Sequence, residues 1–262
     1  MSSMTMSSLQ INRKNINELK KNNMKNVKIN LKKLILLGCH ALLFPSIVNA
    51  GDKATAEEIG AEISIGYDTD YIFRGTNLGS DLLWSDVNVS SSLSEDLDLS
   101  IGAWYANVAD ASGADELDIY AGLSTSFGGM SVDFGSTYYY YPVEGGNTLE
   151  IGIGFGTAAG PIDLSAGLYY DIDLENTYFE IGAGTSFEFT DTIAIEIGAT
   201  VGNNTNLVPD GFTALTIIIG APIAISDSAS LSPYFGINVP IDEYEDIASD
   251  DIFSGISLSV GF

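Results

Sequence analysis

The chain has 262 residues with 35 acidic and 10 basic side chains, which gives a formal net charge of −25. Such a charge excludes a surface that holds nucleic acid or anionic lipid by electrostatic attraction, and it favours cations as partners. The single cysteine, Cys39, and the single histidine, His40, exclude a disulfide framework and a zinc site built from these residue types.

Residues 1–50 have the pattern of a secretory leader. A lysine-rich start after Met24 precedes an apolar run over 34–48, and small residues ending at Ala50 form a cleavage site. The run is shorter than the roughly 20 residues that a membrane-spanning helix needs. We therefore expect translation to begin at Met24, cleavage to follow Ala50, and residues 51–262 to form a single domain.

Cleavage after Ala50 changes the composition of the mature chain. Eight of the ten basic residues are removed with the leader, whereas 34 of the 35 acidic residues remain, so the formal charge becomes 2 minus 34, or −32. Cys39 and His40 are removed as well, which excludes catalysis by cysteine or histidine. A lipoprotein box ending at Cys39 is a weaker alternative, because little apolar sequence precedes that cysteine. The cations that remain are Lys53 and Arg74.

The first segment of the mature chain with a clear pattern is 59–74. Ile63, Ile65 and Tyr67 alternate with smaller or polar residues, and this two-residue period predicts a β-strand with one apolar face. The alternation continues for about 15 residues, whereas a strand of a soluble protein has roughly 5–6. A tilted strand of about 9–11 residues is enough to cross a bilayer.

The same alternation returns along the rest of the chain. Segment 75–81 is predicted to be a loop, and the facing of run 212–224 is ambiguous. The further runs are expected over 83–93, 97–105, 117–127, 130–141, 149–156, 162–171, 179–189, 193–201, 212–224, 231–239 and 252–262.

The connections after the odd-numbered runs look longer than those after the even-numbered runs. An even number of strands with alternating short and long connections is typical of outer-membrane barrels. We therefore predict an all-β fold, a transmembrane antiparallel up-and-down β-barrel of about 12 strands. The alternative is a secreted two-sheet β-sandwich, which would also alternate but has shorter strands.

Charged side chains within the runs share the side opposite to the apolar residues. No run carries a charge in its middle on the apolar side, where contact with lipid would cost several kcal/mol. We expect the other side to line the lumen of the barrel. The predicted pore-lining residues are Glu62, Asp68, Asp70, Arg74, Asp86, Asp118, Asp133, Glu150, Asp163, Asp171, Glu180 and Glu196.

Several side chains have more than one interpretation. Arg74 is expected to be a structural clamp beside Asp68 and Asp70, with gating or orientation of a solute as the alternative. The two aspartates have a spacing that sugar hydrolysis can use, although a lumen wall is favoured. Tyr139 and Tyr141 are predicted to narrow the passage. An outward aromatic belt is predicted at Tyr67, Tyr71, Tyr105, Tyr138, Tyr140 and Tyr170.

Segment 67–75, with the sequence YDTDYIFRG, resembles the block that marks the TorF family of proposed porins early in the mature chain. Segments 116–122 and 138–142 are also similar to that family, so the resemblance covers most of residues 59–262. Thr76-Asn77-Leu78 departs from the family pattern. The resemblance implies an outer-membrane barrel with pore activity and implies no particular substrate.

A barrel of twelve strands lies between the filled eight-stranded barrels and the wide pores of 16–18 strands. About a dozen carboxylates in its lumen would attract cations and exclude anions. We expect a passive channel for ions or small solutes that prefers cations and loses this preference at acid pH. The alternative is a non-conducting structural or adhesive barrel whose acidic loops, such as 242–246, bind divalent cations or partners.

The remaining expectations concern partners and chemistry. Outer-membrane lipid, cations or small solutes, and the barrel-assembly machinery are the expected partners, with the machinery recognising a last strand that ends at Phe262. We expect no nucleic acid, no cofactor, no metal centre and no catalytic residue. A membrane-embedded hydrolase is the least favoured class, because the mature chain has no histidine-based triad.

Overall fold

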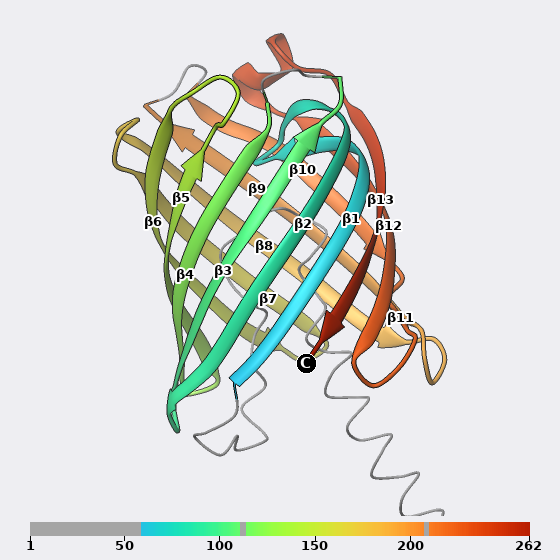
Figure 1. Ribbon diagram of the computed structural model, residues 1–262. Coiled ribbons are helices and arrows are strands. Elements are labelled where there is room, and N and C mark those ends of the chain that lie inside the picture. The colour runs from blue at the N-terminus through green and yellow to red at the C-terminus, as the bar shows by residue number, and fades with distance from the viewer. Residues whose placement is uncertain (1–58, 111–113, 207–209) are drawn as a thin grey trace, which may run out of the picture.

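The computed structural model describes residues 59–110, 114–206 and 210–262, and these form a closed antiparallel barrel (Figure 1). The predicted leader, its cleavage site and Lys53 lie outside the described residues. The strands are β1 (Ile59–Phe73), β2 (Thr76–Ser94), β3 (Leu97–Val108), β4 (Glu116–Phe127), β5 (Met130–Tyr140), β6 (Asn147–Ala159), β7 (Ile162–Asp171), β8 (Asn176–Glu188), β9 (Ala194–Thr205), β10 (Gly211–Gly220), β11 (Ile223–Ala224), β12 (Ala229–Pro240) and β13 (Asp251–Gly261).

Strands that follow one another along the chain pair with one another, except β10 and β11, and two further pairings complete the circle. β1 pairs with β13, and β10 pairs with β12. The short strand β11 pairs with β12 and has one further bridge, between Ile223 and Ile193, so it is an addition to a twelve-stranded barrel. The predicted all-β barrel of about 12 strands is confirmed.

Run 212–224 is divided between two strands. β10 ends at Gly220, and β11 begins only at Ile223. Pro222 lies between them and has no backbone N–H to continue a ladder. The carbonyl of Pro222 instead accepts a hydrogen bond from the backbone of Ala194 at 3.1 Å, which keeps this segment attached to β9.

The expected loop over 75–81 is wrong. β2 begins at Thr76, and the first hairpin turns through only Arg74 and Gly75, which have φ angles of 51° and 81°. Positive φ at both central residues is the requirement of a two-residue type I′ turn, which matches the twist of the strands on either side. The register between the two strands shifts between Asp70 and Ile72, so an irregularity lies close to this turn.

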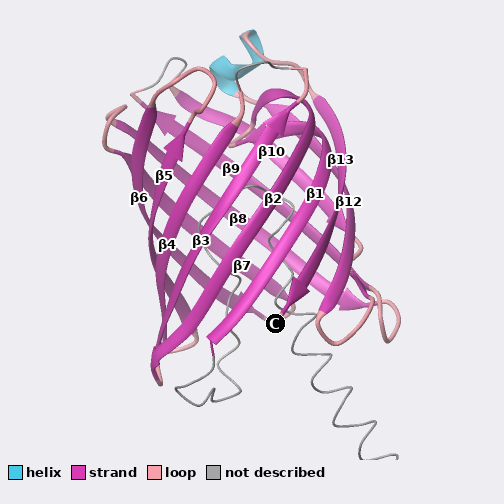
Figure 2. Cartoon of the chain, viewed as in Figure 1, coloured by secondary structure: helices cyan, strands magenta, loops and turns pink. Residues whose placement is uncertain are grey.

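The longer connections gather at one end of the barrel, which we call the mouth. They include 141–146 and 241–250, and the second of these contains the short helix η2 (Asp242–Asp246). Figure 2 shows η2 at this end and the C-terminus at the other. Within the described residues, no helix has the length and apolarity that crossing a membrane requires.

The outward face of the barrel is apolar and uncovered. Ile65, Ile101 and Ile119 are each about half exposed, at 52%, 52% and 51%. Monomeric soluble proteins rarely expose apolar surface in large contiguous areas. Five of the six predicted belt tyrosines are also exposed, but the prediction for Tyr71 is wrong, since only 2% of it is accessible.

Inside the barrel, aromatic rings lie against glycines of neighbouring strands. A Cβ atom at Gly66 would be 2.4 Å from the ring of Trp84, and one at Gly202 would be 2.4 Å from the ring carbon of Tyr178 that carries the hydroxyl. Gly152, which lies in a run of alternating glycines, is covered by Tyr169 in the same way. These glycines therefore let large rings lie close to the wall of the barrel.

The first prediction compares two glycines. Gly66→Ala should destabilise the barrel by about 1–3 kcal/mol, because overpacking forces Trp84 to move, and the Trp84 indole is held by a 2.9 Å hydrogen bond to Asp68. Gly198→Ala is the matched control, since no atom lies within 4 Å of its added Cβ. Urea unfolding of the refolded protein, followed by tryptophan fluorescence, measures both. Equal effects would contradict the packing described here.

Candidate functional site

The end of the first hairpin bends into the mouth of the barrel. We call residues 71–75 the hairpin tip. Tyr71 donates a 2.8 Å hydrogen bond to Glu116 on β4, and Arg74 donates to Glu150 on β6. The carbonyl of Gly75 accepts a 3.0 Å hydrogen bond from Asn238 on β12. Since β4, β6 and β12 lie on different sides of the barrel, the hairpin tip lies within the mouth.

The local backbone explains how the hairpin tip reaches this position. Arg74 has a positive φ, which is uncommon and costly for a residue with a side chain. Gly75 has a positive φ too, and a Cβ atom there would be 2.6 Å from the Cβ of Ala214 on β10. Only glycine fits this contact, so the Arg-Gly pair permits both the turn and its close approach to the opposite wall.

Arg74 and Glu150 form an ion pair across the mouth. Two nitrogens of the guanidinium donate to the two carboxylate oxygens, each at 2.7 Å. The Arg74 side chain is 12% exposed and that of Glu150 only 2%. A planar guanidinium fits a carboxylate in this bidentate manner, and such pairs are among the stronger hydrogen-bonded contacts in proteins.

Three aromatic rings surround the same guanidinium. Its central carbon lies 4.8 Å from the ring centre of Phe73, 4.8 Å from that of Tyr169 and 4.4 Å from that of Tyr178. Cation–π attraction is strongest where water is excluded. Arg74 is therefore held inside the barrel, but its partner is Glu150 rather than the expected Asp68 or Asp70. Its role as a structural clamp stays a prediction.

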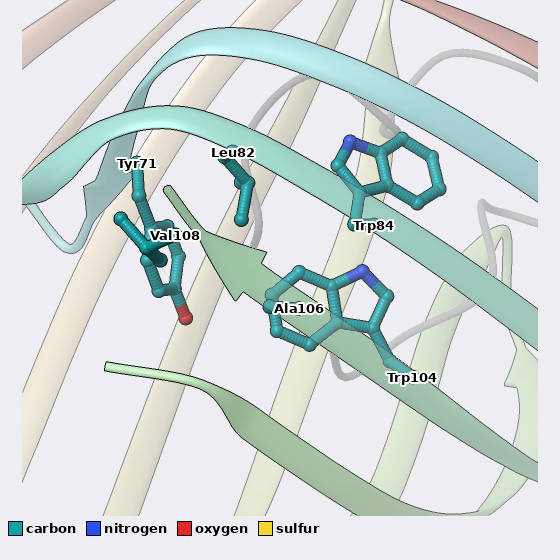
Figure 3. Close-up of a cluster of buried hydrophobic side chains, with 6 residues drawn as sticks. All are labelled: Tyr71, Leu82, Trp84, Trp104, Ala106 and Val108. Atoms are coloured by element: carbon teal, nitrogen blue, oxygen red, sulfur yellow. The ribbon is translucent and has the colours of Figure 1, made fainter. Parts of the chain in front are cut away.

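A buried cluster of side chains lies beside the hairpin tip on β1, β2 and β3 (Figure 3). The ring of Tyr71 lies 5.8 Å from that of Trp104, and Leu82 is fully buried. Tyr71 was expected outside, but the irregularity near Asp70 reverses its side, and it packs within the mouth. The cluster consists of Tyr71, Leu82, Trp84, Trp104, Ala106 and Val108.

The predicted pore-lining residues are all buried or partly buried, whereas many of the apolar residues that alternate with them are exposed. Some have aromatic partners: Tyr120 donates to Asp86 at 2.9 Å, and Tyr169 donates to Glu180 at 3.3 Å. Asp70 lies apart from these, where Asn77 bridges it to Asp251. The buried members are Asp68, Asp118, Asp133, Glu150 and Asp171, and the partly buried ones are Glu62, Asp70, Arg74, Asp86, Asp163, Glu180 and Glu196. Their role in lining a pore stays a prediction.

Sequence reasoning missed two residues of the mouth. Glu116 is the first residue of β4 and is 4% exposed. It lies two residues before Asp118, and this spacing along a strand could have predicted that both side chains share the inward face. Tyr244 lies in η2 and is 5% exposed, and its hydroxyl accepts a 2.8 Å hydrogen bond from Asn204. The acidic segment 242–246 is thereby anchored to the mouth. Among the described residues, no group of three or more His, Cys, Asp or Glu side chains could hold a metal ion.

A comparison with models of known protein families identifies the family of this barrel. Residues 52–244 match the family Gcw_chp, described as a bacterial protein of unknown function. The chain belongs to the Gcw_chp family. The family that matches is Gcw_chp and not TorF, so the predicted membership of the TorF family is not confirmed. No curated protein matches the sequence at a significant level.

Solved structures with a similar fold include several outer-membrane channels. The COG4313 outer membrane channel from Pseudomonas putida F1 is 12% identical, with a TM-score of 0.51 over 81% of the Gcw_chp chain and 98% of the channel. The NanC porin is 8% identical, with a TM-score of 0.50 over 76% of the Gcw_chp chain and 98% of the porin. The KdgM porin is 8% identical, with a TM-score of 0.50 over 77% and 99%. At these identities the likeness shows the fold alone, which is that of porin-like barrels.

The second prediction tests the clamp by a double-mutant cycle. Arg74→Ala and Glu150→Ala should each destabilise the barrel by about 3–5 kcal/mol, because each leaves a buried charge without its partner. The double variant should lose less stability than the sum of the two single losses, since the second substitution removes the charge that the first leaves without a partner. Urea unfolding in detergent measures all four proteins. Additive losses would show that the two side chains do not interact.

Proposed function

We propose that this Gcw_chp protein is a porin-like channel of the outer membrane that passes ions or small solutes, prefers cations, and is narrowest at the hairpin tip. The observation that supports it most is the division of the strands into an apolar exterior and a carboxylate-rich interior. A barrel pairs every backbone group of its wall, which is what the interior of a bilayer demands.

The preference for cations follows from the balance of charge. Arg74 is the only basic residue after Lys53 in the sequence, and its guanidinium donates two hydrogen bonds to Glu150. Its charge is thus neutralised locally. The half of the barrel away from the mouth contains inward carboxylates near the short turns, including Asp133 and Asp163, which lie opposite Gly154 and Gly184 on neighbouring strands. Rings of acidic side chains select cations in known channels.

The third prediction concerns ion selectivity. In planar bilayers with a salt gradient, the reversal potential should indicate cation preference, and this preference should weaken as acid pH protonates the carboxylates. The variant Asp133→Asn with Asp163→Asn should reduce the preference. Glu243→Gln is the control, because that side chain is exposed on η2. A preference for anions would refute the proposed function.

The fourth prediction concerns placement in the membrane. Ile101 and Leu93 are outward and similarly exposed, at 52% and 54%, but Ile101 lies near the middle of β3 whereas Leu93 lies beside the turn at 95–96. Ile101→Lys should cost about 2–4 kcal/mol of stability in lipid vesicles, and Leu93→Lys about 0–1 kcal/mol. Urea unfolding in vesicles measures the difference. Equal costs would argue against a bilayer around the barrel.

A second function is favoured by the buried side chains of the mouth. Leu82, Trp104 and Val108 are at most 2% exposed, and Tyr71 of the hairpin tip belongs to the same buried cluster. A barrel closed in this way would be a structural or adhesive element of the membrane that conducts nothing. The bilayer measurement separates the two functions, because a closed barrel gives no current and liposomes that contain it do not swell in small sugars.

A further inference from the structure

Glu116 and Asp118 form a pair of buried carboxylates beneath the hairpin tip. They lie two residues apart on β4 and share its inward face. Glu116 is 4% exposed and Asp118 is completely buried. Across the neighbouring strands, Asp118 is paired with Trp104 on β3 and with Tyr139 on β5, so large rings lie on both sides of it.

Within the described residues, no basic side chain compensates this pair. Arg74, the one basic residue in the described part of the chain, donates to both carboxylate oxygens of Glu150. Glu116 accepts a hydrogen bond from the hydroxyl of Tyr71. Apart from the carboxyl group of Glu116 beside it, Asp118 has no hydrogen-bond partner for either carboxylate oxygen among the described residues. Burial of two such charges without a compensating group is strongly unfavourable.

A third polar side chain, that of Thr137, faces the same part of the interior. The hydroxyl of Thr137 is completely buried and also has no hydrogen-bond partner within the described residues. Thr137 lies on β5 two residues before Tyr139, the residue paired with Asp118, so it is the diagonal neighbour of Asp118 on the inward face. Buried polar atoms without partners indicate a bound water or ion in many proteins.

We propose that Glu116 and Asp118 bind a cation that prefers oxygen ligands, with the hydroxyl of Thr137 or a water that it holds completing one side. Ca²⁺ matches this chemistry, because it binds carboxylate, hydroxyl and water oxygens in flexible geometry and its charge balances the two carboxylates. The site does not depend on whether the barrel conducts. A bound cation would also fix Glu116, and through it Tyr71, in the mouth.

The test uses the complete mature chain refolded in detergent with Tb³⁺ as the probe for Ca²⁺. Trp104 is the cross-strand partner of Asp118, so excitation of tryptophan should give Tb³⁺ luminescence that saturates and is displaced by excess Ca²⁺. Asp118→Asn should weaken the apparent affinity at least about tenfold, as the loss of a group that holds a metal generally does. Asp96→Asn, in the exposed turn at 95–96 at the other end of the barrel, is the matched control and should bind as the wild type does.

A second measurement does not depend on luminescence. At constant ionic strength, Ca²⁺ should raise the melting temperature of the wild type and of Asp96→Asn, and should raise that of Asp118→Asn much less. Circular dichroism establishes that each variant is folded. Tb³⁺ binding that is unaffected by Asp118→Asn would assign the ion to the acidic loops and overturn the proposal. A melting temperature that depends on pH but not on Ca²⁺ would overturn it too, in favour of a proton shared by the two carboxyl groups.

Discussion

One ion pair holds the first hairpin to the far wall of the barrel. Arg74 and Glu150 are 76 residues apart in the sequence, and their contact is bidentate and nearly dry. The positive φ of Arg74 costs conformational energy, and the carboxylate and aromatic rings around the guanidinium offset that cost. The other contacts of the hairpin tip depend on this pair, because the turn must lie inside the mouth before Gly75 can meet β10 and β12.

Several inward carboxylates of the barrel accept hydrogen bonds from neutral side chains instead of pairing with cations. Tyrosine hydroxyls donate to Glu116, Asp86 and Glu180, and an indole donates to Asp68. Phenol and indole groups combine a large apolar surface with one hydrogen-bond donor, so they can cover the wall and solvate a charge together. Glycines on adjacent strands make room for these rings. Asp118 has no such aromatic donor in the described chain, and it is one of the two carboxylates of the proposed cation site.

The regular parts of the fold were predictable from the sequence, because the two-residue period reports which face of a strand is apolar. The twelve-stranded barrel and the outward position of residues such as Ile101 followed from that pattern. Contacts of the mouth did not. An irregular register near Asp70 places Tyr71 inside, and the alternation of apolar residues does not predict this irregularity. The partner of Arg74 was likewise hidden, since periodicity relates neighbours along a strand and says nothing about strands that face each other across a lumen.

The pairing of β1 with β13 has a consequence for how the molecule is made. The first strand finds its last neighbour only when the whole polypeptide is present, and residues 71–75 contact segments as distant as Asn238. Contacts of such long sequence separation form slowly, because much chain entropy is lost before they are gained. The carbonyl of Gly75 can therefore meet Asn238 only late in assembly. A polypeptide truncated before β12 would lack both the closed wall and this anchor of the first turn.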